Sequence, residues 1–261
     1  MTMLLLALLL PGVARAETCN RNCETRYVDV FGCCPEAPTT PFPRPHVDLA
    51  FPTVLLDPAP AVGEAFWVAR AEQSQALYQS AMAHNPSRFQ DCGADCAVES
   101  IMWCEALLLA NRLSGREWLK TAYKLPEGFK PGLDDDTCRR LAPEVVPNPG
   151  ANGWRLPTAQ EWALAVGGDP PVAPDERGGI AWYASNAEQQ SHASCSRKPW
   201  SHGLCDIAGN VREWAWGPSG ASVACGSGWA TPGTLLVPLE CEPLDPATRS
   251  ADLGVRLVKD R

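Results

Sequence analysis

The fold of this chain is decided by the stretch Gly203-Leu204-Cys205-Asp206-Ile207-Ala208-Gly209-Asn210-Val211-Arg212-Glu213-Trp214, together with Gly153-Trp154-Arg155-Leu156-Pro157-Thr158 and Glu161-Trp162 upstream of it. Neither stretch has the apolar spacing of an amphipathic helix or of a half-buried strand. Both interleave Gly, Asn, Asp and Pro with large aromatic residues. This composition predicts an irregular but tightly packed backbone.

Asp206 and Glu213 place two carboxylates seven residues apart around the turn at Gly209-Asn210. Such a turn can aim backbone carbonyls inward, and carboxylate and carbonyl oxygens together are the ligands that calcium prefers. The alternative is a turn that binds no metal and is held by backbone hydrogen bonds of Asp206 and Asn210. The residue spacing alone leaves both interpretations open.

These stretches resemble the sulfatase-modifying-factor family, the formylglycine-generating enzymes and their relatives. The family's hallmarks read G-[YW]-R-L-P-T-x-x-E-W, G-L-x-D-M-x-G-N-V-x-E-W and a closing G-F-R. Their counterparts here are Gly153 to Trp162, Gly203 to Trp214 and Gly254-Val255-Arg256. Two weaker matches keep the same order, namely Asn85-Pro86-Ser87-Arg88-Phe89 for N-P-S-x-F, and Cys96 to Trp103 with Asn111 to Ser114 for P-V-E-x-V-S-W and N-x-L-S.

The resemblance implies a mixed α+β fold, an elaborated C-type-lectin-like architecture with little regular secondary structure and with disulfide staples. It also implies a calcium site made by the side chains of Asp206 and Glu213 and the carbonyls of Gly209 and Val211. The residues expected to anchor the fold are Arg155, Glu161, Trp162, Asn210 and Trp214. All of these except Asn210 are also expected to be more buried than their types suggest.

Regular elements are sparse in the sequence pattern. Residues 72–82 and 100–113 are predicted helices, and in the second Trp103, Leu107 and Ala110 fall near one face. From Thr121 onward we expect mostly loop with short strands, such as residues 181–183 and 255–258.

The first 45 residues differ from the rest of the chain. Residues 1–16 hold an apolar run followed by Ala14-Arg15-Ala16, which predicts a signal peptide cut before Glu17 and hence an exported protein. Residues 17–45 combine four cysteines with a proline-rich stretch, which indicates either a small stapled module or a processed tail with local bridges. A single sulfatase-modifying-factor-like domain is expected over residues 46–261.

Charge and hydropathy exclude some partners. The formal charge is −8 and becomes −9 once Arg15 is removed with the signal peptide. An acidic chain without a basic patch is a poor partner for nucleic acid or for an anionic membrane surface. The apolar run near the N-terminus is too short to span a bilayer, so we expect no membrane span.

The cysteines indicate disulfides. All twelve follow the expected cleavage point, and an even number in an oxidising compartment favours disulfides over thiolate metal sites. Relatives often carry a short-range pair like Cys92 and Cys96, and a bridge closing the loop from Cys225 to Cys241 would contribute roughly 3 kcal/mol in the chain-entropy model. The full connectivity stays open. The candidates within the domain are Cys92, Cys96, Cys104, Cys138, Cys195, Cys205, Cys225 and Cys241.

Catalytic residues of the family do not carry over. Formylglycine-generating enzymes oxidise a substrate cysteine with oxygen, using two cysteines about five positions apart as thiolate ligands of copper(I). That pair follows an R-G-G-S-[WYF] signature. The counterpart here, Cys225-Gly226-Ser227-Gly228-Trp229, lacks the arginine, and residues 230–240 contain no cysteine. We therefore expect no catalytic residues and no copper, and we expect Cys225 to pair with Cys241.

Three function classes follow from these observations. The first is an exported non-catalytic binding or scaffold protein, whose protein or small-molecule ligand the sequence does not identify. The second is a formylglycine-generating oxidase with a rearranged thiol site, acting on a cysteine of a partner protein. The third is a structural cell-envelope protein whose cysteine-rich head makes the contacts. The missing cysteine pair favours the first over the second.

Overall fold

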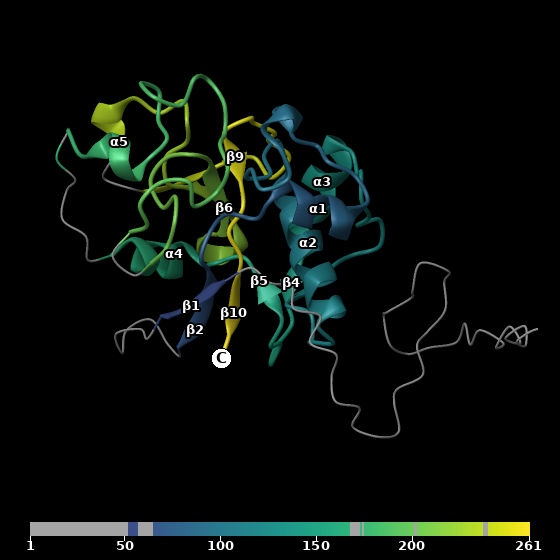
Figure 1. The fold of residues 1–261 in the computed structure, drawn as a ribbon. Coiled ribbons are helices and arrows are strands. Elements are labelled where there is room, and N and C mark those ends of the chain that lie inside the picture. The colour runs from purple at the N-terminus through teal and green to yellow at the C-terminus, as the bar shows by residue number, and fades with distance from the viewer. Residues whose placement is uncertain (1–51, 57–64, 168–172, 174, 201–202, 237–239) are drawn as a thin grey trace, which may run out of the picture. The chain divides into compact units, whose positions relative to one another are not determined.

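The computed structural model describes residues 52–56, 65–167, 173, 175–200, 203–236 and 240–261 (Figure 1). The expected signal peptide and the cysteine-rich segment lie outside these ranges and stay predictions. None of the helices within these ranges has the length and apolar character needed to cross a membrane.

The described domain is mixed α and β with short elements, as the sequence predicts. Its helices are α1 (Gln75–Met82), α2 (Trp103–Arg116), α3 (Asp135–Leu141), α4 (Ala159–Val166) and α5 (Arg177–Ile180), with 3-10 turns at Gln90–Cys92, Ala142–Glu144, Pro218–Gly220 and Gly233–Leu235. Its strands are β1 (Thr53–Leu56), β2 (Phe66–Ala69), β3 (Tyr123–Lys124), β4 (Val146–Pro147), β5 (Trp154–Arg155), β6 (Arg212–Trp216), β7 (Ser222–Cys225), β8 (Cys241–Pro243), β9 (Leu253–Gly254) and β10 (Val258–Asp260).

Two four-stranded sheets organise the domain. One has the order β1-β2-β10-β5 and is antiparallel. The last strand of the chain, β10, therefore lies between β2, from the start of the domain, and the edge strand β5, from the middle of the sequence. The other has the order β8-β7-β6-β9, with β6 and β9 parallel. Figure 1 shows α1, α2 and α3 gathered on one side of the domain, and α4 and α5 on the other.

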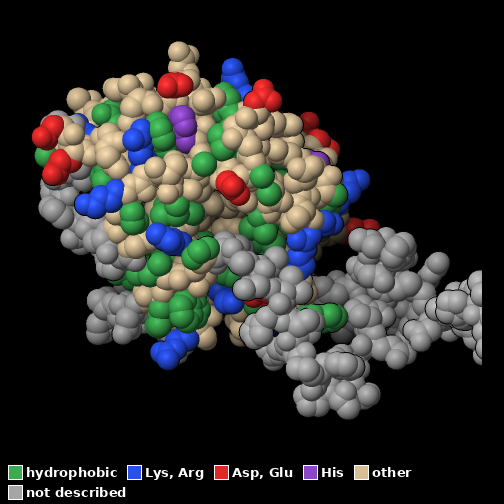
Figure 2. Space-filling view, in the orientation of Figure 1, with side chains coloured by type: hydrophobic (Ala, Val, Ile, Leu, Met, Phe, Trp, Pro, Cys, Tyr) green, Lys and Arg blue, Asp and Glu red, His purple; other side chains and the backbone are tan. Residues whose placement is uncertain are grey.

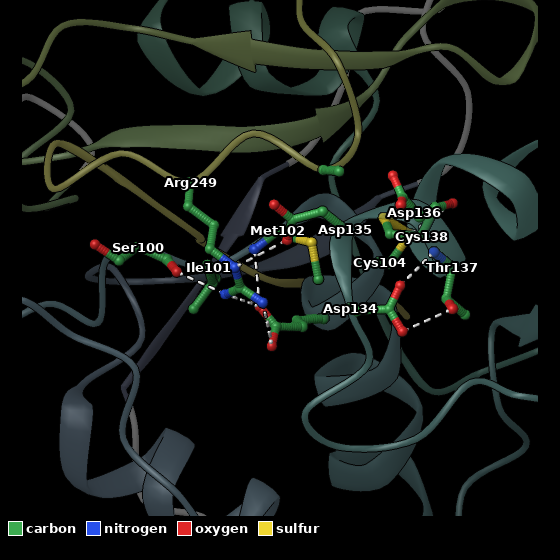
Figure 3. Close-up of polar contacts among 12 residues, drawn as sticks. Ser100, Ile101, Met102, Cys104, Asp134, Asp135, Asp136, Thr137, Cys138 and Arg249 are labelled. Atoms are coloured by element: carbon green, nitrogen blue, oxygen red, sulfur yellow. Dashed lines mark hydrogen bonds and ion pairs between the residues drawn. A yellow bond between two sulfur atoms is a disulfide. The ribbon is translucent and has the colours of Figure 1, made fainter.

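Helix α2 is the central element of the larger hydrophobic core. Its residues from Trp103 to Ala110 are all buried, and Trp214 of β6 packs in the same cluster. The N-terminus of α2 is fixed by Glu105, whose carboxylate accepts a hydrogen bond from the Met102 amide at 2.9 Å and pairs with Arg249 at 2.7 Å. Figure 3 shows Arg249 reaching this helix end, and the Cys104–Cys138 disulfide that joins α2 to α3.

The two predicted helices are present with shifted boundaries. Helix α1 begins at Gln75 rather than at residue 72. Its N-cap is Ser74, whose hydroxyl accepts a hydrogen bond from the Leu77 amide. Glu72 and Gln73 therefore precede the helix. Helix α2 begins at Trp103 rather than at residue 100 and continues to Arg116.

The expectation of loop after Thr121 was wrong at α3, α4 and α5. Helix α4 begins with a capping box, in which the Thr158 hydroxyl accepts from the Glu161 amide and the Glu161 carboxylate accepts from the Thr158 amide. The sequence Thr158-Ala-Gln-Glu161 carries this signal without an apolar repeat. The anchoring tryptophan of this segment, Trp162, lies in the first turn of the helix.

The two predicted strands were also placed wrongly. Residues 181–183 form no strand, because the Trp182 carbonyl accepts a hydrogen bond from the Asn210 amide instead of a strand partner. The run from 255 to 258 is divided: β10 begins only at Val258, while the Val255 carbonyl accepts from the Gln73 amide and the Leu257 carbonyl from the Ala69 amide. Arg256, between them, turns inward.

The surface of the described residues has both hydrophobic and charged side chains. On the face in Figure 2, hydrophobic side chains are interspersed with Lys and Arg, and no single sign of charge covers a broad area of the described residues. The large hydrophobic side chains that are exposed within the described part of the chain are Leu55, Trp118, Val146 and Leu235.

Candidate functional site

The turn at Gly209-Asn210 has a left-handed backbone conformation that its residue types permit. Asp206, Gly209 and Asn210 all have positive φ, at 54°, 84° and 55°. Asn and Asp tolerate this left-handed conformation better than most residues. Gly209 is required for a further reason, since a Cβ there would lie 2.2 Å from the Trp182 carbonyl oxygen.

The Asn210 side chain connects the turn to the loop around His192. Its amide oxygen accepts from the His192 amide at 2.9 Å, and its amide nitrogen donates to the His192 carbonyl and to Glu72, each at 3.3 Å. Asn210 is fully buried, so each of these bonds replaces one that water would otherwise make. The residue acts as an internal connector.

A buried ion pair lies beneath the turn. The Arg256 guanidinium binds the Glu213 carboxylate with contacts of 2.6 and 3.0 Å, and both side chains are almost fully excluded from solvent. Glu213 also accepts from the Trp162 indole nitrogen at 2.7 Å. Arg256 donates further to the carbonyls of Ala69 and Cys205. The pair is fully hydrogen-bonded, as a buried pair must be to persist.

Two more acids share this interior with Arg256. Burial raises the pKa of Glu72 well above its usual value, and the nearby charge of Asp206 raises it further, while Arg256 acts in the opposite direction. Burial also raises the pKa of Asp206, against the hydrogen bond from the Cys195 amide at 2.6 Å. Arg256 is the only arginine or lysine buried in the described part of the chain. One guanidinium thus faces three carboxyl groups.

The expected calcium donors fit a cation only in part. Asp206 fits in part, because its Oδ1 atom is buried and accepts no hydrogen bond from the described residues, while the Glu72 carboxyl lies close enough to hydrogen-bond the Asp206 side chain. Glu213 fits poorly, because both of its oxygens are engaged by Arg256 and Trp162. Among the residues that the structure describes, no group of three or more His, Cys, Asp and Glu side chains could hold a metal ion. Calcium at this turn stays a prediction that rests on Asp206.

The other expected anchors form a second polar network. Arg155 makes a bidentate pair with Glu161, with both contacts at 2.7 Å, and also binds Asp260 of β10. Burial raises the pKa of Glu161, but the hydrogen bonds and charge of Arg155 more than offset this, and the pKa lies below its usual value. The side chains of Arg155 and Glu161 are mostly buried, and Trp162 and Trp214 are fully buried.

The eight candidate cysteines are all joined in disulfides: Cys92–Cys96, Cys104–Cys138, Cys195–Cys205 and Cys225–Cys241. The described residues include no free cysteine. Cys225 and Cys241 face each other on the neighbouring strands β7 and β8. Cys225 and Cys241 flank residues 230–240, the segment in which the resemblance places the copper cysteines and which contains no cysteine here.

A pocket of about 450 Å³ opens beside this bridge. Its charged lining residues include Arg212 of β6 and Glu242 of β8. Its apolar lining residues include Pro232 and the exposed Leu235, from the segment around the 3-10 turn Gly233–Leu235. The lining therefore combines charged and apolar residues.

Sequence reasoning missed two members of the buried cluster. Glu72 was assigned to a helix, and its acidic type gave no sign that it would be buried. Arg256 was noted only as part of the closing Gly-Val-Arg motif. The available signal was that motif together with Glu213-Trp214 at the end of the turn, since a buried arginine requires a buried carboxylate.

Comparisons with known proteins identify the family and similar folds. A family model described as Sulfatase-modifying factor enzyme 1-like domain matches residues 36–261. The chaperone protein LppX of Paenibacillus barcinonensis is 29% identical over 177 residues, which cover 58% of this chain and 61% of that protein, so the match spans less than two thirds of the relative's length.

Two solved structures are also similar. Treponema denticola variable protein 1 is 29% identical with a TM-score of 0.68, covering 76% of this chain and 85% of that one. CarF is 24% identical with a TM-score of 0.59, covering 80% and 93%. The likeness to CarF shows the fold alone.

Proposed function

This chain belongs to the sulfatase-modifying factor enzyme 1-like domain family, and from that premise we propose that it is an exported, non-catalytic domain that binds a ligand. The observation that carries the proposal is the Cys225–Cys241 disulfide. Copper(I) in this family is held by thiolates, and a disulfide sulfur offers no thiolate. With no cysteine in residues 230–240 and no free thiol among the described residues, the domain would keep the fold without thiolate ligands for copper(I).

Export is supported by the four disulfides of the described residues, because such bridges persist in oxidising compartments. The relative named as a chaperone favours a protein as the ligand. An oxidase with a rearranged thiol site is disfavoured, since no described cysteine is free. A structural cell-envelope role would depend on residues 17–45, which lie outside the described residues.

The test is a count of thiols on the mature protein. Alkylation without prior reduction, read by mass spectrometry, should label no cysteine, and a copper(I) competition assay should detect no tight binding. Reduction before alkylation is the positive control and should label all twelve cysteines. Two labelled cysteines together with tight copper(I) binding would replace the proposal with the oxidase.

We propose calcium binding at the turn as a second property, supported by the orphaned Oδ1 atom of Asp206. Asp206, with the carbonyls of Gly209 and Val211, would hold the ion and so neutralise a buried negative charge. Glu213 is not assigned a role, because Arg256 already neutralises it.

Calorimetric titration with calcium chloride tests this property. Heat should be present for the unmodified protein and lost in Asp206→Asn, which keeps an oxygen for the Cys195 amide. Asp91→Asn, at an exposed position, is the matched control and should bind as the unmodified protein does. Equal heats for all three proteins, or none for any of them, would exclude calcium at Asp206.

A further inference from the structure

The pocket beside the Cys225–Cys241 bridge has an unbalanced charge. Three carboxylates line it, from Glu240, Glu242 and Asp252, against the single guanidinium of Arg212. Arg212 divides its contacts between Glu242 at 3.0 Å and Asp252 at 3.3 Å. Glu240 is exposed and has no ion pair with any residue in the described ranges. The formal charge of the lining is therefore −2.

The lining also has apolar residues. Leu235 is 66% exposed, and Pro232 and Ala230 belong to the same lining. Ala224 of β7 and Gly226, which follows β7, are small lining residues. A ligand that contacts both kinds of lining residue has an aliphatic part that lies on Leu235 and a cationic end that reaches the carboxylates.

The neighbouring strand limits how a partner could bind. Strand β8 is at the edge of its sheet, where an extended peptide could in principle add as a further strand. Pro243 within β8 has no amide hydrogen and blunts such an edge. Recognition at this place is thus left to the side chain that enters the pocket rather than to the backbone of the partner.

We propose that this pocket binds a lysine side chain of a partner protein. The four-carbon stem of lysine packs on apolar surface while its ammonium group stays with polar partners, which matches the mixed lining. The ammonium would bind Glu240, which has no ion pair among the described residues, and would share Glu242 with Arg212. The inference rests on the proposed function and names the class of ligand for that domain.

Fluorescence polarisation on the intact mature protein tests the inference. The probe is a labelled peptide of alternating lysine and alanine, and the matched probe carries glutamate in place of lysine. The lysine probe should bind at low ionic strength and weaken as salt is added. The glutamate probe should not bind.

Two double variants separate the pocket from the overall charge. Glu240→Gln with Glu242→Gln should weaken the lysine probe about tenfold, a size consistent with two exposed ion pairs. Glu127→Gln with Glu144→Gln changes the net charge equally at exposed positions outside the pocket and should leave affinity unchanged. Circular dichroism of both variants checks that each is folded.

Equal weakening in the two double variants, or no binding of the lysine probe to the unmodified protein, would overturn the inference. Either result leaves the non-catalytic assignment in place, because that assignment depends on the thiol count. Conversely, free thiols with copper(I) binding would overturn the proposed function whatever the peptide does.

Discussion

Replacing Arg256 with methionine should destabilise the protein more than any other single change in the buried cluster. Methionine keeps an unbranched apolar stem and removes the only buried arginine or lysine of the described residues, which lies close to Glu72, Asp206 and Glu213. Breaking a buried pair by removing one partner costs about 3–5 kcal/mol. Arg256→Met also leaves the carbonyls of Ala69 and Cys205 without a donor, so we expect the upper part of that range.

The converse change should be milder. In Glu213→Gln the guanidinium of Arg256 keeps its two carbonyl partners and two neighbouring acids, so the loss should be about 1–3 kcal/mol, the cost of an unsatisfied buried group. The double variant should cost less than the sum of the single variants, because neither charge is then left alone.

Urea unfolding followed by tryptophan fluorescence, with the disulfides intact, measures these losses. Arg140→Met is the matched control at an exposed position, and its cost should stay within about 0.5 kcal/mol. A loss below about 1 kcal/mol for Arg256→Met, or equal losses for Arg256→Met and Glu213→Gln, would refute the reasoning that one cation supports three carboxyl groups.

Two further predictions concern the other anchors. Trp162→Ala should cost about 3–5 kcal/mol in the same assay, because it empties a fully buried site. Trp118→Ala, at a 64% exposed position, should cost little, and similar losses for the two variants would show that Trp162 is not a core residue. Glu161 has a pKa below its usual value, so its pairing with Arg155 stabilises the fold above the unfolded pKa of about 4.3 and is lost as pH falls through the folded value. Glu161→Gln should therefore flatten the acid decrease in the free energy of unfolding, and an unchanged decrease would contradict this.

The sequence alone determined the family and the character of the fold. The Gly-Asn turn and the two tryptophan segments identify the architecture because they need special backbone conformations and large buried side chains, which only a few residue types supply. Gly209 is an example: its left-handed φ and its contact with Trp182 exclude a side chain. The sequence alone also shows that no cysteine follows Cys225 before Cys241.

Tertiary structure decided what the short-range pattern could not. Glu72 lies more than a hundred residues before Asn210, yet their side chains are in contact, and nothing near Glu72 in the sequence distinguishes it from a solvated acid. Helix α4 escaped prediction because its start depends on a capping box rather than on an apolar repeat. The run from 255 to 258 is divided because Arg256 turns inward to pair with Glu213. The capping box of α4 is a local signal that a search for apolar repeats does not detect. For Glu72 and Arg256, by contrast, the stabilising partner is distant in the sequence and only folding brings it close.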